Sequence, residues 1–378
     1  MCGMTKCDFL VCGSGIAGAS IAYELAASGA SVVVVEQEDR HGYHTTGRSA
    51  AMYLESYGAA PLRRLTVASR AFFDSPPEGF SDYPLLRPRG CLNIAGQESL
   101  GELDALAGEI EATGSRYERL DGSQVRERIP ILRPDACAAA VYEPDAADID
   151  ANALHAGYLK LARARGADMR LSARLMALEP AAQGWRARLE DGGVIEAAAV
   201  VNAAGAWADR VAAMAGAAPL GLQPLRRTII LLDPPQGLDI AAWPVVSDID
   251  EAFYFKPEAG MILASPADET PSDPQDAAPD ELDIAVCVDR LQRAADLPAR
   301  RVARSWAGLR TFAPDRVPVF GYDPRATGFF WFAGQGGYGM QTAPAAARLG
   351  AALARGEGAP EDLVGRGFLA EQVSPARF

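Results

Sequence analysis

The 378-residue sequence has few histidines and no closely paired cysteines. Its three histidines are scattered, and none of its six cysteines belongs to a CxxC motif. Zinc and iron–sulfur sites require closely spaced thiolate or imidazole ligands, so we expect neither a metal site nor a redox-active cysteine pair. The residues concerned are His41, His44, His155, Cys2, Cys7, Cys12, Cys91, Cys137 and Cys287.

Long apolar runs and an excess of basic residues are also missing. No stretch approaches the roughly 20 apolar residues of a membrane span, and the N-terminus leads directly into a predicted strand without a signal-peptide pattern. The formal net charge of −13 disfavours binding to nucleic acid or anionic lipid. We therefore expect a cytoplasmic protein with no membrane span and no nucleic-acid partner.

The composition is that of a globular protein with more than one core. Hydrophobic residues make up 49% of the chain and charged residues 22%, which argues against extensive disorder. A chain of this length exceeds one ordinary domain, so we expect two.

The strongest motif lies close to the N-terminus. The apolar segment 7–12 is followed by Gly13, Gly15 and Gly18 in GxGxxG spacing, by a helical pattern, and by a buried strand at 31–35 that ends at Glu36. Gly13 permits a sharp turn, Gly15 lets the backbone approach a pyrophosphate, and Gly18 lets the helix pack closely on the strand. Glu36 is placed to accept hydrogen bonds from a ribose. This βαβ unit predicts a bound dinucleotide.

Three later segments carry small or polar residues beside predicted strands. Residues 37–53 form a polar loop that we expect to contact the ligand, with a helix starting near Ser49; a solvated loop with Arg48 on the surface is the alternative. Neither His41 nor His44 is assigned to catalysis. Segments 198–208 and 328–340 each run from a strand into small residues and a helix, so both ends of the chain are expected at one cofactor. Between 216 and 301 the pattern predicts an antiparallel sheet.

Taken together, these segments resemble the family of FAD-dependent D-amino acid oxidoreductases that includes glycine oxidase and sarcosine oxidase, and within it the bacterial D-arginine dehydrogenase type. The resemblance rests on the Gly13 fingerprint and on segments 42–51, 201–207, 253–257, 306–310 and 335–339. It implies an α/β fold: a Rossmann-like FAD-binding domain formed by residues 1–80, 146–216 and 304–378. It also implies an α+β substrate domain with an antiparallel sheet, formed by residues 81–145 and 217–303.

The resemblance also assigns cofactor contacts. The ADP half of FAD would be bound by Gly13, Gly15, Ile16, Ala17, Gly18 and Glu36, and the flavin and its phosphates would be lined by Arg48, Ser49, Ala50, Ala204 and Gly205. The flavin ring would lie against Gly336, Gly337, Tyr338 and Gly339. Some family members attach FAD through a cysteine late in the chain, but no cysteine follows Cys287, so non-covalent FAD is expected.

For the substrate, the resemblance assigns the carboxylate to Arg310 and Arg227, helped by the hydroxyl of Tyr254, with Tyr57 as a mobile wall. A core position for Tyr254 and a surface ion pair for Arg310 are the alternatives. Gly337 would also line the substrate pocket. Two positions depart from the D-arginine dehydrogenase pattern: Cys91 stands where an acidic residue is expected, and Met52 where a histidine is expected. Both changes favour neutral or apolar substrate side chains.

The predicted activity is oxidative deamination of D-amino acids to 2-oxo acids and ammonia, by hydride transfer to flavin N5. The electron acceptor stays open between a quinone-type molecule and oxygen. Two alternatives stay open as well: an FAD-dependent oxidoreductase of 2-hydroxy acids such as 2-hydroxyglutarate, and a non-catalytic FAD-binding subunit.

Overall fold

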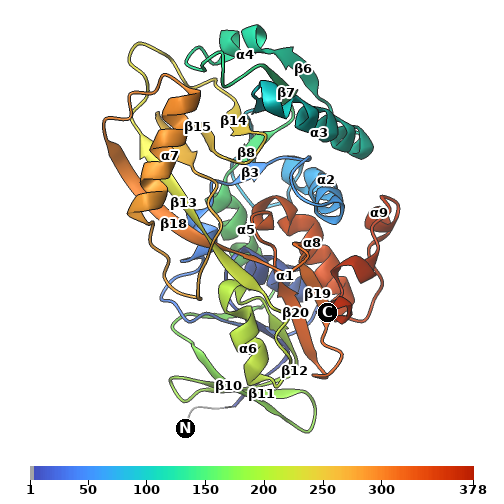
Figure 1. The fold of residues 1–378 in the computed structure, drawn as a ribbon. Helices are drawn as coiled ribbons and strands as arrows, with labels where there is room; N and C mark the ends of the chain where they lie inside the picture. The colour runs from blue at the N-terminus through green and yellow to red at the C-terminus, as the bar shows by residue number, and fades with distance from the viewer. Residues whose placement is uncertain (1–3) are drawn as a thin grey trace.

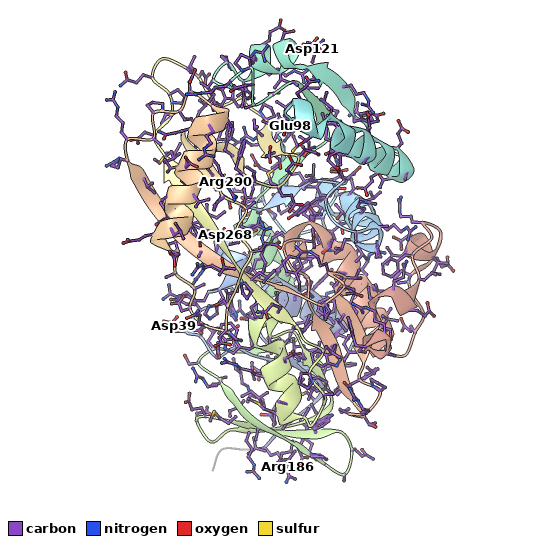
Figure 2. The ribbon with its side chains drawn as sticks, in the orientation of Figure 1. Asp39, Glu98, Asp121, Arg186, Asp268 and Arg290 are labelled. Atoms are coloured by element: carbon purple, nitrogen blue, oxygen red, sulfur yellow. The ribbon has the colours of Figure 1, made fainter. Side chains whose placement is uncertain are left out.

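The computed structural model describes residues 4–378 as two large sheets and one small sheet with helices around them (Figure 1). Cys2 lies outside the described residues. Figure 2 shows Arg186, on strand β11, at one end of the molecule and Asp121, the N-cap of helix α4, at the other. Among residues 4–378, no helix is both long and apolar enough to cross a membrane.

The first sheet has eight strands around a parallel centre. Its five parallel strands lie in the order β20-β12-β1-β2-β9, and the antiparallel strands β10, β11 and β19 extend it. The bounds are β1 Thr5–Cys12, β2 Val32–Val35, β9 Asp168–Arg170, β10 Leu175–Pro180, β11 Trp185–Leu189, β12 Val194–Asn202, β19 Val319–Tyr322 and β20 Phe329–Ala333.

Alternation along β1 decides which helices cover each face of this sheet. Phe9 and Val11 pack with α1 (Ile16–Ala27), α5 (Ala151–Ala164) and α8 (Gly339–Ala354). Leu10 and Cys12 point to the opposite face and pack with α6 (Ala208–Met214). Helices on both faces of a parallel sheet agree with the predicted Rossmann-like architecture.

The second sheet has nine strands and is antiparallel except where β14 pairs with β5. Its order is β17-β13-β16-β15-β14-β5-β7-β6, with β18 also beside β13. The bounds are β5 Cys91–Ala95, β6 Glu118–Asp121, β7 Ala139–Glu143, β13 Gln223–Leu232, β14 Val245–Asp248, β15 Tyr254–Glu258, β16 Met261–Ser265, β17 Thr270–Pro271 and β18 Val302–Phe312.

One face of the second sheet is apolar and the other carries the polar residues. Leu92, Val246 and Phe255 share a core with α7 (Glu281–Ala294). Their neighbours along the strands point the other way because side chains alternate, which puts Asn93 and Tyr254 on the opposite face. The polar face is the one available for a substrate site.

A three-stranded antiparallel sheet and the remaining helices complete the fold. The small sheet consists of β3 (Met52–Tyr53), β8 (Ala147–Ile149) and β4 (Leu86–Pro88). The other helices are α2 Ala60–Asp74, α3 Leu100–Thr113, α4 Gly122–Arg128 and α9 Glu361–Val364, with short 3-10 helices at 45–48, 97–99, 205–207, 370–373 and 375–377. The domain boundaries stay a prediction; β18 falls within the proposed cofactor-domain segment 304–378 but hydrogen-bonds to the second sheet.

The helix expected near Ser49 is wrong. Residues 45–48 form a single 3-10 turn, and the chain then becomes extended into β3. Ala51 has a φ of +42°, which a right-handed helix cannot contain. The turn is also tied to the second sheet, because the Thr45 hydroxyl donates to the carbonyl of Leu309 at 2.6 Å. A long-range contact therefore decides this local structure.

The turn at residues 13–18 requires glycine at two positions. Gly13 has a φ of +100°, and a Cβ there would lie 2.6 Å from the carbonyl oxygen of Ala203 on the neighbouring strand connection. A Cβ on Gly18 would lie only 1.9 Å from the carbonyl oxygen of Gly13. Strand, turn and helix are thus in direct backbone contact, as the spacing of the glycines predicts.

The first prediction compares two glycines within helices. Gly18→Ala should lower the urea unfolding midpoint sharply or prevent folding, because the atom that it meets belongs to the backbone and cannot move aside. Gly108→Ala is the matched control, since Gly108 lies in α3 with open space around its Cα; it should stabilise the protein by up to about 1 kcal/mol. Equal midpoints for the two variants would contradict the turn geometry.

Candidate cofactor and substrate site

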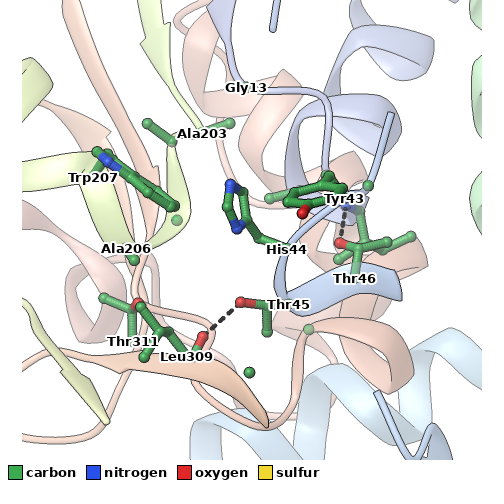
Figure 3. A pocket seen from close by; sticks show the side chains of 18 of the residues that line it. Gly13, Tyr43, His44, Thr45, Thr46, Ala203, Ala206, Trp207, Leu309 and Thr311 are labelled. Atoms are coloured by element: carbon green, nitrogen blue, oxygen red, sulfur yellow. Dashed lines mark hydrogen bonds between the residues drawn. The ribbon is translucent and has the colours of Figure 1, made fainter. Parts of the chain in front are cut away.

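A cavity of about 690 Å³ lies where the two large sheets meet. Its wall combines residues that follow strands of the first sheet, such as Gly13 and Glu36, with residues of the second, such as Arg227 and Arg310. The volume lies within the range of cofactor and ligand pockets, about 300–1,000 Å³. Figure 3 shows residues from several distant segments converging on it.

Most of the predicted site residues line this cavity. They are Gly13, Gly15, Ile16, Ala17, Glu36, Arg48, Ser49, Ala50, Ala204, Gly205, Arg227, Arg310, Gly336, Gly337 and Gly339. The predicted residues outside its wall are Gly18, Met52, Tyr57, Cys91, Tyr254 and Tyr338. Gly18 has the packing role described above, and the others lie around Arg310 or behind it.

The Glu36 end of the cavity contains a hydrogen-bond chain that sequence reasoning missed. One Glu36 carboxylate oxygen accepts from the amide and the hydroxyl of Ser14, at 2.8 and 2.9 Å. The Ser14 hydroxyl meets His41 Nδ1 at 2.9 Å, and Arg163 donates to His41 Nε2 at 2.6 Å. Burial and the nearby Arg163 lower the His41 pKa to about 4, so His41 is neutral at pH 7. This chain orients the carboxylate predicted to face a ribose.

The N-terminus of α1 faces the cavity and is capped by Thr46. The Ile16 amide donates to the Thr46 hydroxyl at 2.9 Å, although the two residues are 30 positions apart. Its close neighbour Gly15 has no side chain, and a Cβ there would lie 3.0 Å from that same hydroxyl. A helix N-terminus with free amides and a hydroxyl suits a phosphate group. Nothing in the local pattern around Thr46 indicates this long-range cap.

Arg48 lines the cavity, but protein acceptors take up its guanidinium. It donates to the carbonyls of Ala277 and Ala307 at 2.8 and 3.0 Å, and it forms an ion pair with Asp276. The Tyr43 hydroxyl also donates to Asp276, at 2.9 Å. Arg48 therefore ties the loop before α7 and strand β18 to the cavity wall, so its predicted phosphate contact stays a prediction.

His44 lies between two aromatic rings beside the cavity (Figure 3). Its ring centroid is 4.9 Å from that of Tyr43 and 4.6 Å from that of Trp207. Its Nε2 meets Glu38 Oε1 at 2.8 Å, and its buried Nδ1 has no hydrogen-bond partner among the described residues. His44 thus belongs to the cofactor end of the cavity, away from Arg310.

The glycine turn before α8 packs directly on β18. The Gly336 amide donates to the carbonyl of Thr311 at 2.9 Å, and Gly336 has a φ of +54°. A Cβ on Gly336 would lie 2.2 Å from the ring of Phe312, and one on Gly337 would lie 2.8 Å from the Arg310 guanidinium. Only glycine fits this contact, which brings the backbone before α8 against Arg310.

Arg310 has no acidic partner. Its Nη1 donates to the Tyr57 hydroxyl at 3.1 Å, and no carboxylate of the described residues forms an ion pair with it. Arg227 lies diagonally across the neighbouring strand, since Leu225 pairs with Arg310 and Arg227 pairs with Gly308. Arg227 is 6% exposed and pairs with Glu269 at 3.3 Å. The alternative of a surface ion pair for Arg310 is therefore wrong.

Tyr254 lies on the polar face of the second sheet and its hydroxyl is free to bind. This hydroxyl is buried and has no hydrogen-bond partner among residues 4–378. A buried phenol normally finds an acceptor or donor, so its position beside Arg310 is that of a ligand contact. The alternative, a satisfied core tyrosine, lacks the hydrogen bond that it requires.

Cys91 and Met52 lie side by side in a small apolar cluster. The cluster also contains Leu54, Ala146 and Val245, and Cys91 is only 1% exposed. Burial raises the pKa of the Cys91 thiol well above its usual range, so the thiol is neutral. The predicted pairing of these two positions is confirmed as a contact, while their role in a substrate pocket stays a prediction.

The residues present fit a dinucleotide along the cavity. Gly13, Gly15 and Gly336 leave backbone exposed where a Cβ would meet another group, a helix N-terminus faces the wall, and Glu36 is oriented near it. Among the described residues, no group of three or more histidine, cysteine or acidic side chains is arranged to hold a metal ion.

Comparison with known proteins supports this reading of the cavity. Glycine oxidase of Geobacillus kaustophilus is 26% identical over 352 residues, covering 89% of this chain and 90% of that protein. One of the opine oxidase polypeptides of Rhizobium meliloti is 27% identical over 345 residues, covering 87% of this chain and 89% of that protein.

Solved structures show the same fold. The crystal structure of glycine oxidase from Geobacillus kaustophilus matches with a TM-score of 0.83 and 23% identity, covering 94% of this chain and 96% of that one. L-proline dehydrogenase from P. horikoshii matches with a TM-score of 0.85 and 21% identity, covering 100% and 98%. The family model described as FAD dependent oxidoreductase matches residues 8–353. The chain therefore belongs to this family, the DAO family of FAD-dependent oxidoreductases, and its cofactor is FAD.

Proposed function

We propose that the protein oxidises D-amino acids with neutral side chains to imino acids, which water hydrolyses to 2-oxo acids and ammonia. Bound FAD supplies the acceptor for the hydride that leaves Cα. The named relatives include an oxidase of glycine and a dehydrogenase of L-proline, so the family accommodates amino acids of different kinds. We retain closeness to the D-arginine dehydrogenase type, non-covalent FAD and a cytoplasmic location as parts of this hypothesis.

The observation that carries the proposal is the unpaired guanidinium of Arg310 in the cavity wall. A charge in such a place is costly unless an opposite charge joins it. A carboxylate matches the planar fork of a guanidinium and can accept two parallel hydrogen bonds. Arg310 therefore selects substrates with a carboxylate and fixes their orientation.

Three neighbours complete the carboxylate site. Tyr254 offers a buried hydroxyl with no other partner, and Tyr57 already contacts Arg310. Arg227 adds a second positive charge on the adjacent strand, moderated by Glu269. With the carboxylate held at several points, Cα and its amine keep one orientation, which lowers the entropic part of the activation barrier by several kcal/mol, on the order of 5.

The protein need not supply a base when the amine binds in its neutral form. Neither His41 nor His44 contacts Arg310 or its neighbours, and both lie towards the other end of the cavity. The N-terminus of α8 follows directly on the glycine turn, and its dipole stabilises negative charge in the cavity. The electron acceptor is left open between a quinone-type molecule and oxygen.

Arg310→Met should lower kcat/KM for amino acids by at least about 100-fold, or about 2.7 kcal/mol, because the substrate carboxylate loses its charge partner. FAD content should be unchanged, since the described contacts of Arg310 lie at the substrate end. Arg304→Met on the same strand is the control, because Arg304 is exposed and outside the cavity wall. Steady-state kinetics and flavin absorbance measure both quantities; unchanged kcat/KM in Arg310→Met would refute the proposal.

The side-chain preference is tested by anaerobic flavin bleaching with a panel of D- and L-amino acids and 2-hydroxyglutarate. D-leucine, D-methionine or D-phenylalanine should exceed D-arginine in kcat/KM by at least about tenfold, which corresponds to about 1.4 kcal/mol. The physical reason is that the Met52 and Cys91 cluster offers apolar contact and no counter-charge. Cys91→Glu should shift preference towards D-arginine and D-lysine. Fastest bleaching by 2-hydroxyglutarate would point to the hydroxy-acid alternative.

The pH dependence of kcat/KM should follow loss of the proton from the substrate ammonium. Activity should therefore rise with pH and level off without a descending limb from an enzyme histidine. His44→Asn should leave the midpoint of this profile unchanged. A bell-shaped profile that disappears in His44→Asn would show that a histidine takes the proton, contrary to the proposed mechanism.

A further inference from the structure

Glu143, the last residue of β7, is a buried carboxylate outside the cavity wall. It is 4% exposed and forms no ion pair with a basic residue among those described. Burial raises its pKa to about 7, while hydrogen bonds from Ser56 and Asn93 act in the opposite direction. A buried carboxylate without a cation is costly, so the groups that bond to it are informative.

Glu143 connects the second sheet to the segment before α2. One carboxylate oxygen accepts from the Ser56 hydroxyl at 2.7 Å and from the Asn93 side-chain amide at 2.9 Å. Asn93 belongs to the polar face of the sheet, in the row that continues through Ser247 to Tyr254. Ser56 belongs to the connection between β3 and α2 and immediately precedes Tyr57.

The same connection is held at Tyr57 from the other side. Arg310 donates to the Tyr57 hydroxyl at 3.1 Å, and the Tyr57 ring lies 4.7 Å from that of Tyr338. Gly58 has a φ of +95°, and a Cβ there would lie 2.8 Å from the Tyr338 ring. Two consecutive side chains, Ser56 and Tyr57, therefore attach one segment to Glu143 and to Arg310.

We propose that Glu143 is a positioning residue that holds Tyr57 against Arg310 through Ser56, and so determines how tightly the substrate carboxylate binds. The inference rests on the proposed function, because it assigns the carboxylate to Arg310. Losing the Ser56 hydrogen bond lets the segment shift, and Tyr57 moves with it. Since carboxylate recognition depends on the placement of several groups, a small shift weakens binding without removing any group from the site.

The chemistry of the proposal distinguishes the possible replacements of Glu143. Glutamine keeps an oxygen that accepts from Ser56 and Asn93, so it retains the positioning contact. Leucine is similar in size and has no acceptor. The charge of Glu143 is thus dispensable and its acceptor oxygen is essential, which separates this role from a general electrostatic effect.

The experiment measures two quantities on the FAD-loaded protein: the Kd of benzoate, a carboxylate that cannot be oxidised, from flavin absorbance, and the KM of the best substrate. Ser56→Ala and Glu143→Leu should raise both by about fivefold, the effect of one hydrogen bond worth about 1 kcal/mol. Glu143→Gln should stay within about twofold of the unmodified protein. The matched control is Ser69→Ala, which removes a buried hydroxyl of α2 that bonds a helix carbonyl; it should leave both quantities unchanged.

A double-mutant cycle then tests the connection to Tyr57. Ser56→Ala should raise the benzoate Kd in the unmodified protein but add nothing in a Tyr57→Phe background, where the hydroxyl contact with Arg310 is already lost. Additive effects, or equal losses in Glu143→Gln and Glu143→Leu, would overturn the inference. Tight binding of benzoate that no variant changes would overturn it alone. A protein that binds no benzoate and is bleached by no amino acid would instead overturn the proposed function, and this inference with it.

Discussion

Direct contact between backbone segments at glycine is the constraint on which the rest of this structure depends. Gly13 lies against Ala203 and Gly18 lies against Gly13, so the ends of β1, β12 and α1 meet with no side chain between them. Because these groups are backbone, none can move aside by rotating about a side-chain bond. The cavity begins where these glycines end, and its floor is consequently lined by amides and carbonyls suited to a large polar cofactor.

A second contact of the same kind brings the C-terminal part of the chain to the substrate end. Gly336 and Gly337 pack on Phe312 and Arg310, so the turn before α8 is set by a strand of the other sheet. The cavity is therefore built by two glycine turns, one from each end of the sequence. This explains why the fold tolerates relatives that share only about a quarter of their residues with this chain.

The sequence predicted the parts of the site that depend on local spacing. Gly13, Gly18 and Glu36 are recognisable because a strand, a turn and a helix need them at those positions, and their surroundings agree with that expectation. What could not be predicted depends on contacts across the chain. Thr46 caps α1 over 30 residues, and Arg48 bonds to carbonyls more than 200 residues away. The expected helix near Ser49 fails for the same reason, since Thr45 is tied to Leu309.

The second sheet carries two buried charges of opposite sign that do not meet. Arg310 lies on β18 and Glu143 on β7, and each is bonded only by neutral groups. Pairing them directly would stabilise the fold but would leave no charge for a substrate. Keeping them apart leaves Arg310 available to an incoming carboxylate, and the hydroxyls of Ser56 and Tyr57 satisfy each in the meantime. The short segment that carries both hydroxyls is thus the one place where the stability of the sheet and the affinity for the substrate depend on the same residues.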